Sequence, residues 1–392
     1  MFAFGMDAYI IAGIIPEISS FFQINEAQSA QMVTAFTLCY ALSAPILATV
    51  LSNVPTKKTL ILSMVLFIAA NLATIFSINL TMLLISRALA GIGAGIFSPL
   101  AAASAASLVP EEKKGRALGL ILGGMSAGTV VGVPTGLALS SYIGWQGIFG
   151  LVILIALLGL IGVIAGVHEV NAPPPPSLKE RVTLLASKQV SATIAVTFLT
   201  AVASLGLYSY LAPIISSITD TTQMTPYLWT WGLGGMIGSF TVGHLIDWSK
   251  KPRVLLVVIL AVMSLSLCAI PFGLLLASPL MFLPFLLWGA TGWSSLAPQQ
   301  HTLLELQPQQ GAAVVALNSS CNYLGGSAGT ILGAVWLSNS LPIKSMPFAA
   351  AIVGICAVII QLFIVHAHNT KNRVSKEVAV QISFKAGKGV PN

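Results

Sequence analysis

The chain has 392 residues, of which 56% are hydrophobic and only 7% are charged. Soluble domains carry roughly 25% charged residues, so this composition excludes an ordinary soluble protein and indicates one that lies in a lipid bilayer. The formal net charge of +7 would suit a nucleic-acid partner, but the positions of the basic residues give that charge another meaning.

Apolar stretches near or above the ~20 residues that cross a bilayer occur twelve times, six in each half of the chain. They lie at about residues 1–16, 29–51, 58–77, 82–109, 116–141, 146–167, 189–217, 226–246, 253–277, 279–303, 311–337 and 346–366. We therefore predict an all-α membrane protein with twelve transmembrane helices.

The first apolar stretch is shorter than its counterpart in the second half. Fifteen residues precede Pro16, whereas about 24 separate Gln189 from the equivalent Pro213. At 1.5 Å per residue, fifteen residues make ~22 Å, which is less than the ~30 Å hydrocarbon core. We therefore expect a truncated first helix, with about ten residues and a cytoplasmic start missing before Met1.

Asp7 is the only carboxylate well inside a predicted span. It lies nine residues before Pro16, roughly 13 Å below the outer end of the helix. A charge at this depth costs at least ~2.5 kcal/mol, so a function such as proton carriage is expected of it. A paired structural carboxylate, or one close to a helix end, is the alternative.

Arg87 is the only lysine or arginine well inside a predicted span. It lies roughly 8 Å inside the outer end of the fourth span, at a depth comparable to that of Asp7. A fixed positive charge facing a cavity would stabilise the ionised carboxylate or hold an anionic or carbonyl-bearing substrate. We hypothesise that Asp7 and Arg87 are coupled; an arginine that snorkels to the outer interface is the alternative.

The fifth span carries Gly124, Gly128 and Gly132, followed by Pro134 and Gly136. Glycines four residues apart form a smooth stripe on which another helix can pack closely, and the proline adds a kink point. This pattern predicts close packing that seals a transport pathway. Ordinary helix packing without a gating role is the alternative.

Several features of the first half recur in the second half at a nearly constant offset. Pro16 recurs 197 positions on as Pro213, Gly128, Gly132 and Gly136 recur as Gly325, Gly329 and Gly333, and Gly91 and Pro110 recur one position later as Gly289 and Pro308. Matches in order at one offset indicate a duplicated unit.

Four consecutive prolines at 173–176 separate the two halves. Proline fixes an extended backbone and lacks the amide that a helix needs, so this segment is expected to be a semi-rigid connector. We divide the chain into a six-helix bundle at 1–167, a cytoplasmic linker at 168–188, a second six-helix bundle at 189–366 and a basic cytoplasmic tail at 367–392.

Sixteen of the eighteen lysines and arginines fall on one side of the predicted helices. Only Lys344 falls on the other side, and Arg87 lies within a span. This is the positive-inside pattern, which predicts that both termini lie in the cytoplasm. The excess of lysine and arginine therefore indicates how the chain is oriented in the membrane, and we expect no nucleic-acid partner.

A charged turn follows the eighth span. Gly243 and Asp247 precede the basic residues Lys250, Lys251 and Arg253. An aspartate at a helix end followed by three bases can form a charge cluster on the inner face that latches helices in one state. A plain solvated loop is the alternative.

These motifs resemble those of the major facilitator superfamily over essentially the whole chain. Residues 243–253 resemble its cytoplasmic loop signature, 87–93 its fourth-helix arginine motif, and 124–136 the fifth-helix motif of its drug/proton antiporter branch. Residues 5–9, 288–294 and 298–300 look most like those of sugar and purine-nucleoside efflux pumps. In the loop of the first half, Ser52 stands where the family commonly has aspartate.

The resemblance implies two pseudo-symmetric six-helix bundles that rock around a central site lined by helices 1, 4, 7 and 10. On the tenth span, Trp288, Ser295 and Gln299 fall on one face, which would suit a flat or ring-bearing polar substrate. Further expected cavity residues are Tyr9, Tyr208, Tyr210, Asn318 and Asn322. The alternatives are interface anchoring for the tryptophan and bonds between helices for the amides.

We therefore expect proton-coupled efflux of a small polar or aromatic solute, such as a purine nucleoside or base, a sugar or a drug, across a bacterial inner membrane. Asp7 would take a proton from outside and release it inside. The proton gradient would supply the energy, with no metal or other cofactor, and the protein would be a monomer with protons, a small solute and the lipid bilayer as its partners. No cluster of catalytic groups suggests an enzyme; a proton-symport importer of a sugar or nucleobase and a non-transporting membrane sensor are the alternatives.

Overall fold

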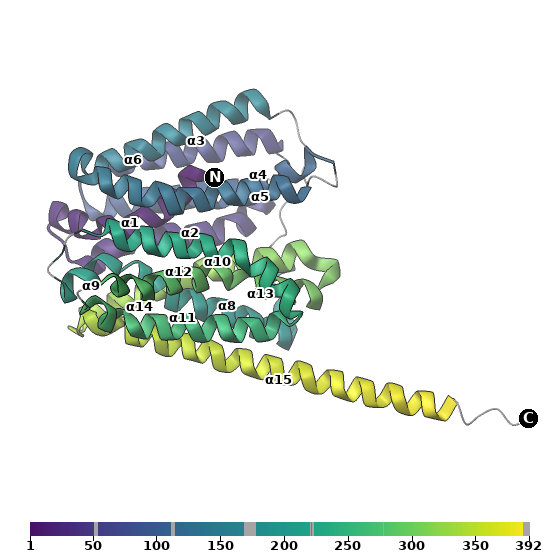
Figure 1. Cartoon of the computed structure of the whole chain (residues 1–392). Helices are drawn as coiled ribbons and strands as arrows, with labels where there is room; N and C mark the ends of the chain where they lie inside the picture. Colours follow the sequence, from purple (N-terminus) through teal and green to yellow (C-terminus); the bar gives the residue numbers. More distant parts are fainter. Residues whose placement is uncertain are drawn as a thin grey trace, which may run out of the picture.

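The computed structural model describes residues 1–50, 54–110, 114–167, 178–219, 221, 223–276 and 278–386. Within these ranges every regular element is helical. Figure 1 shows two groups of helices packed side by side, the upper from the first half of the chain and the lower from the second half. Ser52 and residues 168–177, which include the four prolines, lie outside the described residues.

Six helices and one π-helical turn form the first group. They are α1 (Phe2–Phe22), α2 (Glu26–Val50), α3 (Thr56–Ile75), α4 (Leu80–Ser107), α5 (Lys114–Ala127), the turn Gly128–Gly132 and α6 (Val133–Gly166). α4 packs on α2 and α3, while α1 packs on α2, α5 and α6. α1 and α4 therefore lie in the interior of this group, where most of their side chains meet other helices.

The second group has more breaks than the first. It consists of α7 (Leu178–Thr183), α8 (Lys188–Tyr208), α9 (Leu211–Ile218), α10 (Thr225–Ser249), α11 (Pro252–Leu274), α12 (Leu283–Ser294), α13 (Leu296–Leu306), α14 (Gly311–Ser338) and α15 (Met346–Ala386). α8 packs on α14 and α15, and α12 packs on α10 and α11. In Figure 1 the end of α15 projects beyond the other helices.

Eight described segments are long and apolar enough to cross a membrane. One of them, Gly123–Gly166, contains Gly144 with φ 65° and ψ 173°, where a kink divides two helices, so it covers two of the predicted spans. Each of the twelve predicted spans coincides with a helix or a pair of helices. That α2, α10 and α14 cross the bilayer as well stays a prediction.

The first predicted span ends too early. We placed its end at Pro16, but α1 continues to Phe22 with the proline inside it. Neighbouring helices can stabilise the backbone around a proline within a membrane, so the residue need not end a helix there. The helix ends where Gln23 adopts a left-handed conformation and its N–H bonds to the carbonyl groups of Ser19 and Ser20.

A π-helical turn interrupts the fifth predicted span at Gly128–Gly132. Its wider hydrogen-bond spacing appears in the bond from the Val133 N–H to the Gly128 carbonyl. Pro134 follows directly, and a proline cannot donate to the preceding turn and clashes with its carbonyl. The wider turn accommodates both effects, so the helix continues where a regular α-helix would be disrupted.

Glycines let the backbones of helix pairs touch in both halves. A Cβ atom on Gly128 would lie 2.8 Å from the carbonyl carbon of Phe2 in α1, and one on Gly325 of α14 would lie 2.8 Å from the Cβ of Ala201 in α8. Gly91 likewise faces α2, and Gly289 faces α10. Glycines that the sequence repeat relates thus lie at equivalent helix crossings, as a duplicated unit requires.

The two groups meet along a few helices. α2 packs on α14, α1 on α9, and α10 on the π-helical turn and α6. The rings of Tyr40 and Tyr323 lie 4.0 Å apart across the α2–α14 contact. Away from this interface the surface is strongly apolar, with Leu158, Leu265 and Phe363 more than half exposed, which suits helices that face lipid rather than water.

The linker between the groups is partly helical. Arg181 of α7 donates from Nη1 to Ser320 Oγ at 2.8 Å and is 3% exposed, and Leu184 is 4% exposed. Both residues anchor the linker to the second group, beside α14.

Candidate functional site

Two charged side chains meet inside the first group of helices. Arg87 of α4 donates from Nη1 to Asp7 Oδ1 at 2.9 Å and from Nη2 to Asp7 Oδ2 at 2.8 Å. Both side chains are 0% exposed. Two parallel bonds are the geometry in which a guanidinium holds an ionised carboxylate. The two residues that we paired from the sequence are thus in direct contact, and their part in transport stays a prediction.

An amide and two aromatic rings complete the surroundings of the guanidinium. Asn71 of α3 accepts a hydrogen bond from Arg87 Nη1 at 3.1 Å and donates to the Phe67 carbonyl at 3.0 Å. The rings of Phe36 in α2 and Phe149 in α6 lie 4.8 and 5.2 Å from the guanidinium carbon. Ring faces at this distance attract a cation. The positive charge is therefore stabilised by groups other than the carboxylate.

α1 presents the carboxylate on one side and a tyrosine on the other. Asp7 and Tyr9 are two residues apart, a rotation of about 200° around a helix. The carboxylate points into its own helix group, whereas Tyr9 lines a pocket against the second group. Any shift of α1 that follows a change at Asp7 therefore also moves a wall of this pocket.

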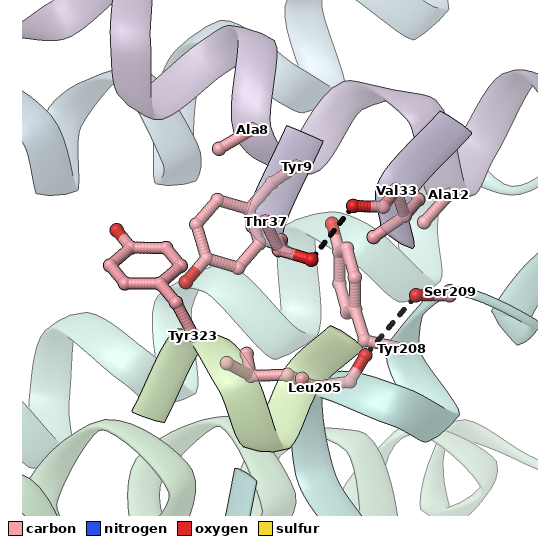
Figure 2. Close-up of a pocket in the computed structure, with 10 residues that line it drawn as sticks. Ala8, Tyr9, Ala12, Val33, Thr37, Leu205, Tyr208, Ser209 and Tyr323 are labelled. Carbon is pink, nitrogen blue, oxygen red and sulfur yellow. Dashed lines mark hydrogen bonds between the residues drawn. The ribbon is translucent and has the colours of Figure 1, made fainter. Parts of the chain in front are cut away.

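The pocket lies between the two groups of helices (Figure 2). Its lining residues are Ala8, Tyr9, Ala12, Val33 and Thr37 from the first half and Leu205, Tyr208, Ser209, Tyr323 and Gly326 from the second. None of them is an acid, a lysine, an arginine or a histidine. The pocket is therefore aromatic and weakly polar, and both halves contribute to it.

Tyr9 inserts into a cluster of rings from the second half. Its ring centroid lies 5.6 Å from that of Tyr208, 6.0 Å from that of Trp231 and 6.1 Å from that of Trp293. Tyr208 and Trp231 are themselves 4.4 Å apart. The Tyr208 hydroxyl and the Trp231 Nε1 are buried, and neither has a hydrogen-bond partner among the described residues.

Two other predicted cavity residues have their polar atoms already bonded. Trp288 is 0% exposed and donates from Nε1 to Ser204 Oγ at 2.8 Å. Tyr210 is 1% exposed and donates from its hydroxyl to the Thr330 carbonyl at 2.6 Å. Neither lines the described pocket. In this conformation both residues support the second group of helices from within.

The amides of Gln299 and Asn318 meet at one hydroxyl. Thr197 Oγ1 lies 2.9 Å from Gln299 Oε1 and 2.6 Å from Asn318 Oδ1. One O–H donates a single hydrogen, so at least one amide must present its NH₂ group to Thr197 instead. As placed, Gln299 Nε2 and Asn318 Nδ2 have no hydrogen-bond partner among the described residues. Both amides are 0% exposed and lie between helices of the second half.

The last two predicted cavity residues, Ser295 and Asn322, lie on different helices of the second group. Ser295 is 1% exposed, and its hydroxyl donates to the Gly292 carbonyl at 2.8 Å, where α12 gives way to α13. Asn322 is half-buried on α14. Neither is among the residues that line the pocket, so a substrate contact from either stays a prediction.

Several residues of the site escaped the sequence interpretation, among them Asn71, Thr37, Trp231 and Tyr323. An amide in the middle of an apolar span is costly unless it is paired, and that signal could have identified Asn71. Trp231 and Tyr323 gave no such signal, because tryptophan and tyrosine are also enriched at the membrane–water interfaces.

The glycines of the fifth span differ in how closely they pack. A Cβ on Gly128 would meet the backbone of Phe2, but one on Gly124 would lie 3.5 Å from the Met1 Cβ, an ordinary contact. At Gly132 and Gly136 the neighbours are side chains of α1, which can shift. Gly128 is therefore the position at which this helix most needs a glycine.

The charged turn after α10 lies at the end of the helices where most lysines and arginines occur, which we call the basic end. Gly243, Asp247 and Lys250 are exposed, and Asp247 has no ion pair with a described residue. Arg253 instead pairs with Glu305 of α13 at 2.8 Å. This pair joins α11 to α13, and a gating role for the four predicted residues stays a prediction.

Comparison with known proteins is consistent with this architecture. Residues 1–330 match the family model of the Major Facilitator Superfamily. The chain is 24% identical to the inner membrane transport protein YdhP of Escherichia coli (strain K12), covering 90% of each chain. It is 25% identical to a probable sugar efflux transporter of Mannheimia succiniciproducens, over 91% of this chain and 90% of the relative.

A third relative is a chloramphenicol resistance protein of Streptomyces lividans. It is 27% identical over 81% of this chain and 76% of the relative. The all-helical fold, the apolar outer surface and the match to the family model agree with one another. The chain therefore belongs to the Major Facilitator Superfamily and is a multi-pass membrane transporter, not an enzyme.

Proposed function

We propose that this transporter exports a small polar or aromatic solute in exchange for protons, with Asp7 and Arg87 as the coupling pair. The observation that carries this proposal is the ion pair at 2.8 Å, fully buried on a helix whose opposite side lines the pocket. Export is supported by relatives named as a sugar efflux transporter and a chloramphenicol resistance protein.

A proton that arrives at Asp7 changes how α1 is held. While the carboxylate is ionised, two hydrogen bonds from Arg87 fasten α1 to α4. A proton on Oδ1 or Oδ2 removes the charge and one of the acceptor positions, so that this link weakens. α1 is then free to shift, and Tyr9 moves with it. Binding of solute in the pocket and protonation of Asp7 are therefore mutually exclusive, as antiport requires.

The surroundings of Arg87 lower the free-energy cost of protonating Asp7. Removing one partner of a buried ion pair typically costs about 3–5 kcal/mol because the other charge is left without compensation. Here Asn71 still accepts from Nη1, and two phenylalanine rings still flank the guanidinium. Each ring contact contributes roughly 0.5–2 kcal/mol. The unpaired arginine is thus partly stabilised in advance.

The pair is closed off from solvent in this conformation, so proton exchange requires another arrangement of the two halves. We propose that they rock about the contacts of α2 with α14 and of α1 with α9. The distribution of basic residues supports placing the basic end and both termini in the cytoplasm, and the name of one relative supports the bacterial inner membrane. We expect a monomer, since both halves of the pocket come from one chain.

Purified protein in liposomes tests the proposal. The vesicles contain a pH-sensitive dye and are exposed to outward gradients of nucleosides, pentoses and cationic drugs in turn. Antiport predicts that the transported solute leaves as protons enter, and that an imposed pH gradient drives solute against its own gradient. Protons that move in the same direction as the solute would instead identify a symporter, and solute movement without a pH change would exclude proton coupling.

Asn71→Leu is expected to shift the pH dependence of transport without abolishing it. The variant removes an acceptor that helps to hold Arg87 once Asp7 is neutral, so protonation of the carboxylate becomes less favourable. A hydrogen bond to a charged group contributes about 1.5 kcal/mol or more, equivalent to about one pH unit. Half-maximal exchange should therefore require a pH about one unit lower, measured as initial rate against pH.

Thr74→Ala is the matched control for Asn71→Leu. Thr74 is also a buried polar residue of α3, but its hydroxyl contacts Ser86 Oγ at 2.8 Å and not Arg87. It should lower stability slightly and leave the pH profile in place. Equal shifts in both variants would mean that Asn71 acts only through the packing of α3.

A further inference from the structure

The pocket also carries information about the class of solute. We propose that it selects an uncharged, planar, ring-bearing solute with a hydrogen-bond acceptor at its edge, and that the Tyr208 hydroxyl is the donor that recognises this acceptor. This inference rests on the proposed export function, because it assigns the solute of the same pocket.

The Tyr208 hydroxyl is available to donate a hydrogen bond to a solute. The residue is 4% exposed and lines the pocket, yet its hydroxyl has no partner among the described residues. Leaving a buried polar group unbonded is costly. Tyr210, two residues later, is buried to a similar degree and donates to the Thr330 carbonyl. Of these two hydroxyls at the end of α8, only the one on the pocket is left available.

Two smaller hydroxyls of the pocket, those of Thr37 and Ser209, already have hydrogen-bond partners. Thr37 donates to the Val33 carbonyl at 2.8 Å, and Ser209 lies within bonding distance of the Leu205 carbonyl and of Thr330 Oγ1 (Figure 2). Thr37 can therefore offer a solute only an acceptor. A donor from Tyr208 and weak acceptors around it favour a solute whose principal polar group is a carbonyl or ring nitrogen.

Aromatic rings give the pocket its preference for flat solutes. Figure 2 shows the ring of Tyr9 between those of Tyr323 and Tyr208. Tyr9 and Tyr208 meet edge to face, with an interplanar angle of 77° and centroids 5.6 Å apart. Rings that pack on one another in this way also pack on a flat solute. A sugar, which has many hydroxyl groups and no flat face, would leave most of its own polar groups unpaired here.

The charges around the pocket disfavour a cation. No lining residue is acidic, and the nearby Asp7 is bonded through both oxygens to Arg87. The pair has no net charge when Asp7 is ionised and a charge of +1 when it is protonated, so neither state attracts a cation. The pocket does not attract an anion either, because Phe36 and Phe149 flank the guanidinium inside the first helix group.

Three solutes of the same shape but different charge test the proposal. Nicotinamide is neutral and has a carbonyl acceptor, 1-methylnicotinamide is a cation, and nicotinate is an anion. Binding of each to the purified protein is measured by quenching of tryptophan fluorescence, since Trp231 and Trp293 lie next to Tyr9. We expect nicotinamide to bind most tightly. Tyr208→Phe should weaken its binding about tenfold, the effect of one lost hydrogen bond.

Tyr142→Phe is the control, because Tyr142 is 84% exposed and is not among the residues that line the pocket. It should bind nicotinamide as the unaltered protein does. Tighter binding of either ion, absence of binding by all three solutes, or an unchanged affinity in Tyr208→Phe would each overturn the proposal. The binding measurement needs no pH gradient, so its result can be interpreted even if the liposome experiment shows no proton coupling. A negative binding result likewise leaves the test of proton coupling unaffected.

Discussion

Asp7→Asn is expected to reduce solute movement driven by a pH gradient to the background rate. The asparagine has nearly the shape of the aspartate but cannot exchange a proton, and it can accept only one of the two hydrogen bonds from Arg87. Solute movement down its own gradient should become slower and independent of pH, because asparagine, like the protonated aspartate, holds α1 to Arg87 by fewer hydrogen bonds. The measurement compares gradient-driven and solute-driven flux in the same liposomes.

The same variant leaves a buried arginine without its counter-charge, so a damaged fold is a second way in which it would lose transport. The double variant Asp7→Asn with Arg87→Met separates the two effects. Replacing both members of a buried ion pair by uncharged residues of similar size is often neutral or stabilising. We expect thermal stability to return in the double variant while proton coupling stays absent. Recovery of coupling as well would show that the pair is structural.

Asp7 and Arg87 could be predicted from the sequence because charge is scarce in this chain. A charged group inside a membrane span is costly, and a second charge of opposite sign at a similar depth is the obvious partner. Their contact required only that α1 and α4 be neighbours. The Asn71 contact was not predicted, because an amide can bond to any nearby helix and the sequence does not say which one is near.

The helices themselves followed from apolar length, but most of their interruptions did not. The break at Gly144 falls between two predicted spans, whereas the breaks at Ser209–Tyr210 and at Ser295 and the π-helical turn before Pro134 lie inside runs that read as continuous. Such breaks depend on how helices pack, which a one-dimensional pattern does not record. The break after α8 matters for function, since Tyr208 and Ser209 line the pocket at that point.

The pocket shows a second limit of the sequence. Trp288 was assigned to the cavity and Trp231 was not, yet Trp288 bonds to Ser204 while Trp231 keeps an unbonded Nε1 beside Tyr208. The resemblance assigned the central site to helices 1, 4, 7 and 10, whereas Trp231 lies on the eighth predicted span. Only the bonding partners separate a ring that supports the fold from one that is available to a solute.

Gly128→Ala is expected to destabilise the protein and to stop transport, whereas Gly124→Ala, one turn earlier on the same helix, should do neither. The new methyl group at position 128 would lie 2.8 Å from the Phe2 carbonyl carbon and 3.0 Å from the Met6 nitrogen, so the backbone of α1 must move. Overpacking of a core typically costs 1–3 kcal/mol, and a clash with backbone lies at or above the upper end of that range. Because α1 carries both Asp7 and Tyr9, the displacement reaches the ion pair and the pocket together.

At position 124 the nearest atom is 3.5 Å away, and alanine favours a helix over glycine by about 1 kcal/mol. Thermal unfolding in detergent and transport in liposomes measure both effects, and equal behaviour of the two variants would mean that close contact at Gly128 is not required. The related Gly325→Ala in α14, whose methyl group would meet the backbone of Phe198 in α8, should reproduce the loss of stability but leave α1 and its ion pair in place.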